Sequence, residues 1–250
     1  MLKSIQIVCI TALVLMAGCG SGTVSSSESE STNAPTETSA SPANDATSSD
    51  AQSSASAEET AEQAIAEQLP DTLVIPGERV GPVTDSTSRA ELAEIFGESR
   101  LTDEDVYVGE GFTEPGTHVE LGSEYSFKII WADDSRSAPL EVRELGSAWT
   151  TPQGIGIGTS FSELRDTLGS FELYGFAWDY GGTVVLDETT LADYSEYLVL
   201  RVQPTDAAQQ DTSDYQAVTG ESIYKSDNPH FGALDLRVSD MIVLLNIPGT

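Results

Sequence analysis

The chain of 250 residues carries 41 acidic and 11 basic side chains, which gives a net charge of −30. A surface this acidic repels the phosphates of nucleic acids and of anionic lipid headgroups, because phosphate binding requires lysine and arginine side chains that displace counterions. The composition therefore excludes a nucleic-acid-binding protein. The charge is typical of a protein that stays soluble in a salty or crowded exterior, and attraction for cations or basic partners is the alternative explanation.

Residues 1–18 have the pattern of an export signal. Lys3 makes the start positive, an apolar run extends from Ile5 to Met16, and small residues stand just before Cys19. The run is too short to cross a bilayer as a stable helix. Residues 15–19, with the sequence Leu-Met-Ala-Gly-Cys, resemble the lipobox of bacterial lipoproteins, with Met16 at the position where leucine is usual.

The lipobox resemblance implies that Cys19 is lipidated and becomes the first residue of the mature chain. Cys9 lies in the removed segment, so the mature protein has no second cysteine for a disulfide. Several acyl chains make a durable membrane anchor without a transmembrane helix. The residue after Cys19 is Gly20 and not aspartate, which in Gram-negative families favours the outer membrane. The sequence therefore predicts a lipid-anchored protein of the bacterial cell envelope.

Residues 19–69 predict the lipidated cysteine followed by a disordered linker. From Gly20 to Leu69 there are nine acidic residues, no lysine or arginine, and no tryptophan, tyrosine or phenylalanine. Such a segment has too little apolar surface to offset the entropy of ordering. Residues 56–69 also have a helix-forming composition, so this end of the linker is either a short helix or more of the same spacer.

An internal repeat organises the rest of the chain. Thr87–Gly97 lines up with Thr159–Gly169 at an offset of 72 residues, with Thr, Ser, Glu, Leu and Gly identical. In each copy a serine followed three residues later by glutamate forms a capping box, apolar residues make one stripe, and glycine ends the helix. The repeat predicts an α+β protein with two tandem units, 70–152 and 153–250, each a short helix packed on an antiparallel sheet.

Alternating apolar residues predict strands after each helix. Residues 125–131 and 140–143 form a hairpin in the first copy, and residues 174–180 and 183–186 form one in the second. Further strands are expected at residues 197–202, 216–219 and 241–245. Residues 98–118 show no such alternation and are expected to form an irregular insertion.

The repeat carries a resemblance to known families. The order glycine, apolar residue, Thr-Ser-x-x-Glu-Leu, three residues, apolar residue, glycine, followed by an aromatic-bearing strand, looks like the helix entry of the small outer-membrane lipoproteins of the BamE/SmpA group. It is also similar to the tandem-repeat fold of the β-lactamase inhibitor protein. The resemblance covers residues 87–97 and 159–169 and the hairpins after them. It implies a non-catalytic protein that presents a sheet face to another protein, here a partner in the envelope.

Aromatic strand residues are the candidates for such a binding face. Two arrangements are open: the small residues of the strand face the helix and leave the aromatic side chains outside, or the aromatic side chains fill the core. In the first arrangement the binding residues are Tyr174, Phe176, Trp178, Tyr180 and Trp131.

The sequence offers few residues that could support an enzymatic function. The two histidines are His118 and His230, and a hydrolase would combine His230 with a carboxylate such as Asp227. Acidic runs such as residues 103–105 and 133–134 offer calcium ligands without the spacing of a calcium-binding hand. The glycines at 154–158 lack the spacing of a dinucleotide loop. The sequence therefore predicts no catalytic residue, no metal site and no cofactor, with a hydrolase or a cation-binding surface protein as the alternatives.

Overall fold

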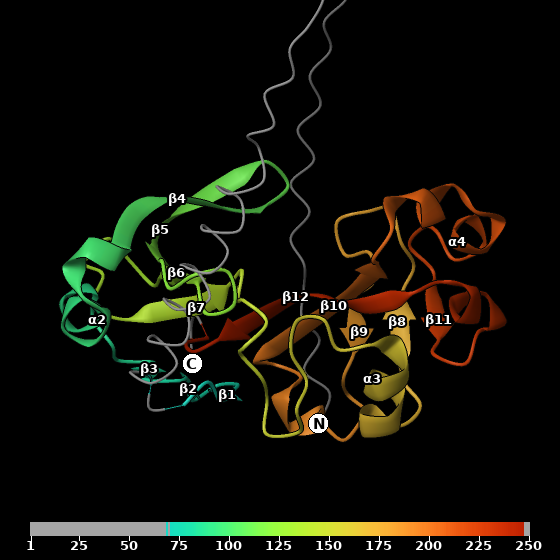
Figure 1. Ribbon diagram of the computed structural model, residues 1–250, viewed down its shortest axis with the longest axis horizontal. Helices are drawn as coiled ribbons and strands as arrows, with labels where there is room; N and C mark the ends of the chain where they lie inside the picture. Colours follow the sequence, from blue (N-terminus) through green and yellow to red (C-terminus); the bar gives the residue numbers. More distant parts are fainter. Residues whose placement is uncertain (1–68, 70, 248–250) are drawn as a thin grey trace, which may run out of the picture. The chain divides into compact units, whose positions relative to one another are not determined.

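The computed structural model describes residue 69 and residues 71–247 (Figure 1). The predicted export signal, the Cys19 lipidation site and almost all of the predicted linker lie outside the described residues, and they stay predictions. Within the described residues the class is α+β, with short helices and antiparallel sheets, which confirms the class expected from the sequence.

The helices are short and separated along the chain. The α-helices are α2 (Arg89–Phe96), α3 (Phe161–Leu168) and α4 (Ser213–Ala217). The 3₁₀ helices are η1 (Glu98–Arg100), η2 (Ala192–Tyr194), η3 (Ala207–Asp211) and η4 (Pro229–Ala233). Among the described residues no helix has the length and apolar character needed to cross a membrane.

The strands form one six-stranded sheet and two three-stranded sheets. The six-stranded sheet has the order β10-β12-β7-β6-β5-β4, with β4 (Leu101–Gly109), β5 (Phe112–Val119), β6 (Phe127–Trp131), β7 (Pro139–Arg143), β10 (Leu198–Pro204) and β12 (Leu236–Leu244). One small sheet joins β1 (Val74–Ile75), β2 (Arg79–Val80) and β3 (Val83–Thr84). The other has the order β11-β8-β9, with β8 (Glu172–Tyr174), β9 (Val184–Val185) and β11 (Ile223–Lys225).

Both repeat helices begin and end as their sequences predict. In each, the N-cap serine accepts a hydrogen bond from the backbone of the glutamate three residues on, and that glutamate accepts one from the serine backbone. The pairs are Ser88 with Glu91 and Ser160 with Glu163. The terminating glycines have positive φ, 91° at Gly97 and 81° at Gly169. The helices are thus confirmed one by one, whereas the duplication of a whole unit stays a prediction.

Strands from both predicted units join in the six-stranded sheet. Strand β12 pairs with β10 on one side and with β7 on the other, so Val243 lies opposite both Leu198 and Val142. These three residues are buried on the same face of the sheet. The sheet therefore continues across the boundary expected between residues 152 and 153.

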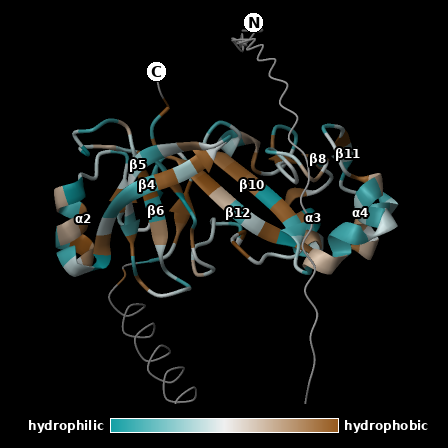
Figure 2. Ribbon diagram, turned by 90° about the horizontal axis from the view of Figure 1, so that it is seen from above, coloured by the Kyte–Doolittle hydropathy of each residue, from teal (hydrophilic) through white to brown (hydrophobic). Residues whose placement is uncertain are grey.

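The core lies on this face of the sheet and extends under the helices. Phe127 of β6 is fully buried, and its ring contacts Phe96 of α2 at 5.7 Å and Trp149 at 5.3 Å, both edge to face. Figure 2 shows hydrophobic residues concentrated along strands such as β10 and β12, whereas α4 is largely hydrophilic. The alternating pattern of the strands thus sets which face is buried.

Two segments differ from the sequence-based expectation. Residues 98–118, expected to be irregular, form η1 and most of the β4–β5 hairpin. Strand β4 is an edge strand rich in acidic residues, and an edge strand has no need of a regular apolar alternation. Residues 216–219, expected to be a strand, belong in part to α4, which begins where the Thr212 hydroxyl accepts a hydrogen bond from the backbone of Tyr215.

Candidate binding surface

Two of the five aromatic residues predicted to bind a partner lie in the core. Trp131 is 5% exposed, and its indole Nε1 donates a hydrogen bond to the Thr117 hydroxyl at 2.9 Å. Phe176 is fully buried and stacks on Tyr215, with the ring centres 5.0 Å apart. The expectation that Trp131 and Phe176 are exposed binding residues is therefore wrong, because their rings fill space between elements that are distant in the sequence.

The strand predicted over residues 174–180 ends early, at Tyr174. The next residue, Gly175, runs so close to another segment that a Cβ on it would lie 2.5 Å from the carbonyl oxygen of Gly220. Two residues later Ala177 has a positive φ of 66°. The chain therefore turns, and the alternation expected between Tyr174 and Tyr180 does not hold.

The turn leaves the other three predicted residues in an aromatic row. The ring of Trp178 contacts Tyr174 at 5.7 Å and Tyr180 at 5.2 Å, both close to edge to face. The indole Nε1 of Trp178 donates a hydrogen bond to the Gly175 carbonyl at 2.8 Å, which fixes the ring. Tyr174 and Trp178 are half-buried, and Tyr180 is 50% exposed. The row thus runs from the end of β8, the central strand of its sheet, out to solvent.

The β4–β5 hairpin supplies two further exposed aromatic side chains, which the sequence analysis missed. Tyr107 is 58% exposed and Phe112 is 64% exposed, on either side of a tip with positive φ at Gly109, Glu110 and Gly111. The backbone N–H of Gly111 donates to the Tyr107 hydroxyl at 3.3 Å. A glycine-glutamate-glycine turn between aromatic residues is the signal that could have revealed them. Figure 1 shows the hairpin at one side of the sheet, with its tip on the side of β10 and β12.

The hairpin tip, the 179–180 turn and β10 enclose a hollow of about 360 Å³, here named the hairpin hollow. It is lined by Tyr107, Val108, Gly109, Glu110, Phe112, Asp179, Tyr180 and Arg201. A second hollow of about 270 Å³ shares Tyr107, Val108, Gly109 and Arg201, and adds Arg143, Glu144, Asp240 and Ile242 from the sheet. The hairpin thus covers two adjoining hollows, which lie on the face of the sheet opposite the core.

Ion pairs offset the charges of the side chains on the sheet beneath the hairpin. Nε of Arg143 lies 2.7 Å from a carboxylate oxygen of Glu141, and Nη1 of Arg201 lies 3.5 Å from one of Asp240. Burial raises the pKa of both carboxyl groups, and the neighbouring arginines oppose this shift. Arg143 also donates through Nη1 to the Tyr107 carbonyl, which ties the hairpin down to the sheet.

The acidic residues at the opening of the hairpin hollow differ from the paired carboxylates on the sheet beneath it. Glu110 and Asp179 line the hairpin hollow and form no ion pair within the part of the chain that the structure describes. The uncompensated charge of the hollow is therefore negative, beside three exposed aromatic rings.

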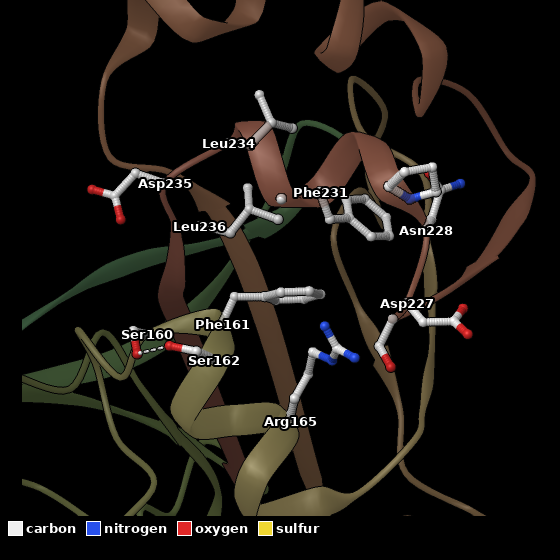
Figure 3. Close-up of a pocket in the computed structure, with 13 residues that line it drawn as sticks. Ser160, Phe161, Ser162, Arg165, Asp227, Asn228, Phe231, Leu234, Asp235 and Leu236 are labelled. Carbon is white, nitrogen blue, oxygen red and sulfur yellow. Dashed lines mark hydrogen bonds between the residues drawn. The ribbon is translucent and has the colours of Figure 1, made fainter.

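A separate hollow of about 360 Å³ lies between α3 and η4 (Figure 3). Phe161 and Phe231 form its apolar floor, with their ring centres 5.4 Å apart. Arg165 points toward the space between these rings and Asp227 in Figure 3. The aromatic rings here are buried, at 9% and 2% exposure, so this hollow lacks the exposed aromatic side chains of the hairpin hollow.

Neither histidine lines any of these three hollows. Nδ1 of His230 lies 2.8 Å from a carboxylate oxygen of Asp214 on α4, so the carboxylate beside it is not the expected Asp227. Nε2 of His118 lies 3.5 Å from a carboxylate oxygen of Glu120. Among the described residues no group of three or more histidine, cysteine, aspartate or glutamate side chains is placed to hold a metal ion.

Comparisons with known proteins give no family. No protein-family model matches the chain, and no curated protein matches it. A solved structure that the chain resembles is the crystal structure of the uncharacterized protein yfeY from Escherichia coli, with 17% sequence identity and a TM-score of 0.40. The match covers 70% of this chain and 99% of that one. A likeness of this size supports no functional assignment.

Proposed function

We propose that this protein is a lipid-anchored binding module of the bacterial cell envelope, which holds another envelope protein at the hairpin hollow. The lipobox-like residues 15–19 support the anchor, and the acidic linker before residue 69 supports a domain held away from the membrane. The observation that carries the binding role is the gathering of Tyr107, Phe112 and Tyr180 at one hollow.

Exposed aromatic side chains of this kind suit protein binding. Tyrosine and phenylalanine supply large contact areas with few rotatable bonds, and aromatic residues are enriched at protein interfaces. The described chain has five large apolar side chains that are exposed, and three of them line this one hollow. The other two are Ile95 and Ile223, which line none of the hollows described above.

The fixed floor of the hollow supports the same role. The hydrogen bond from Arg143 to the Tyr107 carbonyl holds the hairpin against the sheet, and ion pairs position Arg143 and Arg201 beneath it. A surface that is already ordered loses less conformational entropy when it binds.

Site-specific photo-crosslinking in intact cells tests the proposal. A photoreactive benzoylphenylalanine replaces Phe112 in one variant and Ile95, which is 43% exposed, in a matched control. We expect a discrete adduct from position 112 that is absent from position 95. Adding Tyr180→Ala to the first variant should abolish that adduct and leave the protein level unchanged.

Two outcomes would contradict the proposal. One is the same set of adducts from positions 112 and 95, which would mean random collisions at the surface. The other is a specific hydrolase activity that His230→Ala abolishes, which would make the protein an enzyme and not a binding module.

A further inference from the structure

The hairpin hollow combines aromatic faces with free carboxylates. Tyr107, Phe112 and Tyr180 are each at least half exposed around it. The faces of aromatic rings carry a negative potential that attracts cations, and arginine and lysine are the protein side chains that use this attraction most often. Glu110 and Asp179, at the same hollow, add two negative charges that no neighbouring cation in the described chain neutralises.

The one cation that lines the hollow already has a partner. Nη1 of Arg201 lies 3.5 Å from Asp240, which lines the adjoining hollow. An anionic occupant would therefore meet Glu110 and Asp179 without gaining a free arginine. The whole chain, at a net charge of −30, would repel such an occupant as well.

We propose that the partner protein inserts an arginine or lysine side chain, carried on an extended basic segment, into the hairpin hollow. The apolar stem of that side chain packs against Tyr107, Phe112 and Tyr180, and its charged end donates hydrogen bonds to Glu110 and Asp179. This inference rests on the proposed function, and it specifies the chemistry of the partner.

Size and geometry favour arginine over lysine. A hollow of about 360 Å³ is at the small end of ligand sites, which suits one long side chain and not a folded element. The planar guanidinium stacks on aromatic rings and presents several N–H groups to carboxylates at once, whereas the ammonium of lysine is a point charge. An arginine-bearing segment should therefore bind more tightly than a lysine-bearing one.

Tryptophan fluorescence offers a local signal for this binding. Trp178 is half-buried and contacts Tyr180 at 5.2 Å, whereas Trp131 and Trp149 are buried in the core. The full chain, in a non-ionic detergent and at about 0.15 M salt to screen long-range attraction, is titrated with heptapeptides of alternating glycine and one other residue. The other residue is arginine, lysine, glutamine or glutamate. Trp178→Phe identifies the part of the signal that comes from the hollow.

A pair of charge-matched double variants separates specific binding from general attraction to an acidic surface. Glu110→Gln with Asp179→Asn removes two charges from the hairpin hollow. Asp187→Asn with Glu188→Gln removes two charges from a different hollow, whose lining includes none of the exposed aromatic side chains. We expect the first pair and Tyr180→Ala each to weaken arginine-peptide binding by about three- to tenfold. The control pair should leave it within about twofold.

Equal weakening by the two double variants would overturn the inference, because attraction would then come from the whole surface. Tighter binding of the glutamine or glutamate peptide would also overturn it. If the crosslink from position 112 forms and depends on Tyr180 while no arginine peptide binds, the proposed function stands and this inference fails. If the crosslink is also missing, both fail.

Discussion

Gly175 sets the path of the segment that carries Phe176, Trp178 and Tyr180. Its backbone passes so close to Gly220 and Val218 that any Cβ would lie 2.5 Å and 2.8 Å from their carbonyl oxygens. This close approach directs Phe176 into the core and leaves Tyr180 in solvent. The positive φ of Ala177 then turns the chain between the structural aromatic residue of the segment, Phe176, and the exposed one, Tyr180.

Truncation should distinguish these two aromatic residues. Phe176→Ala should lower the free energy of unfolding by about 3 to 5 kcal/mol, because it leaves a cavity beside Tyr215. Tyr180→Ala should change it by about 1 kcal/mol or less, because the side chain is half exposed. Urea denaturation followed by circular dichroism measures both values. Equal losses in the two variants would contradict the assignment of Phe176 to the core and Tyr180 to the binding surface.

The two repeat helices begin and end in the same way, but they contact the rest of the protein differently. The first residue of α2 is Arg89, whose guanidinium contacts Glu98 at 2.9 Å and Asp103 of β4 at 3.0 Å. The first residue of α3 is Phe161, whose ring contacts Phe171 at 5.5 Å. The first residue of α2 therefore contacts its neighbours through charges, whereas the first residue of α3 does so through an apolar ring.

The charged contact keeps its carboxylate ionised. Burial would raise the pKa of Asp103, but a hydrogen bond from the Thr117 hydroxyl and the nearby guanidinium groups of Arg89 and Arg136 outweigh burial and lower it. Exposed ion pairs contribute at most about 1 kcal/mol each. The packing of α2 therefore depends mainly on its buried residues Leu92 and Phe96, the latter against Phe127 of β6.

The glycines that end these two helices allow a prediction about stability. Gly97→Ala and Gly169→Ala should each lower the free energy of unfolding by about 1 kcal/mol, because φ is positive at both positions. An added Cβ meets no atom within 4 Å at either glycine, so the cost comes from the backbone conformation alone.

Gly232 in η4 is the matched control for these variants. A Cβ there also meets no atom within 4 Å, but its φ is not positive. Gly232→Ala should leave stability unchanged or raise it by up to about 1 kcal/mol, because alanine restricts the unfolded chain. Thermal and urea unfolding of the three variants measure this contrast. A loss at Gly232 equal to that at Gly97 would contradict the backbone explanation.

At the scale of the whole molecule, the six-stranded sheet joins the two halves of the domain. Because β12 pairs with both β7 and β10, residues before and after position 152 share one hydrogen-bonded ladder. The hairpin hollow depends on this arrangement, since Tyr107 comes from the first half and Tyr180 and Arg201 come from the second.

The predicted lipid anchor at Cys19 determines where the whole molecule is held. Cys19→Ser should abolish incorporation of labelled palmitate and release the protein from the membrane fraction or leave an uncleaved precursor. Cys9→Ser is the control, because Cys9 lies in the segment that signal cleavage removes. Metabolic labelling measures the incorporation of palmitate in both variants, and fractionation measures their release from the membrane. Processed Cys19→Ser protein that stays on membranes would refute lipidation as the anchor.

The sequence by itself determined the features whose signals are local. The serine-to-glutamate spacing at Ser88 and Ser160 was sufficient to place the two helices, because a capping box forms within four residues. The apolar pattern along residues 125–131 and 197–202 was sufficient to predict strands there, and β6 and β10 form within these ranges or start in them.

Only the tertiary structure decided which aromatic side chains remain exposed and which carboxylate lies beside His230. Phe176 is buried because Tyr215 stacks on it, and His230 contacts Asp214 because α4 packs near η4. The hairpin hollow likewise needs the β4–β5 hairpin and β10, which are far apart along the chain. Composition and periodicity describe neighbours in sequence, whereas burial and exposure result from contacts between distant segments.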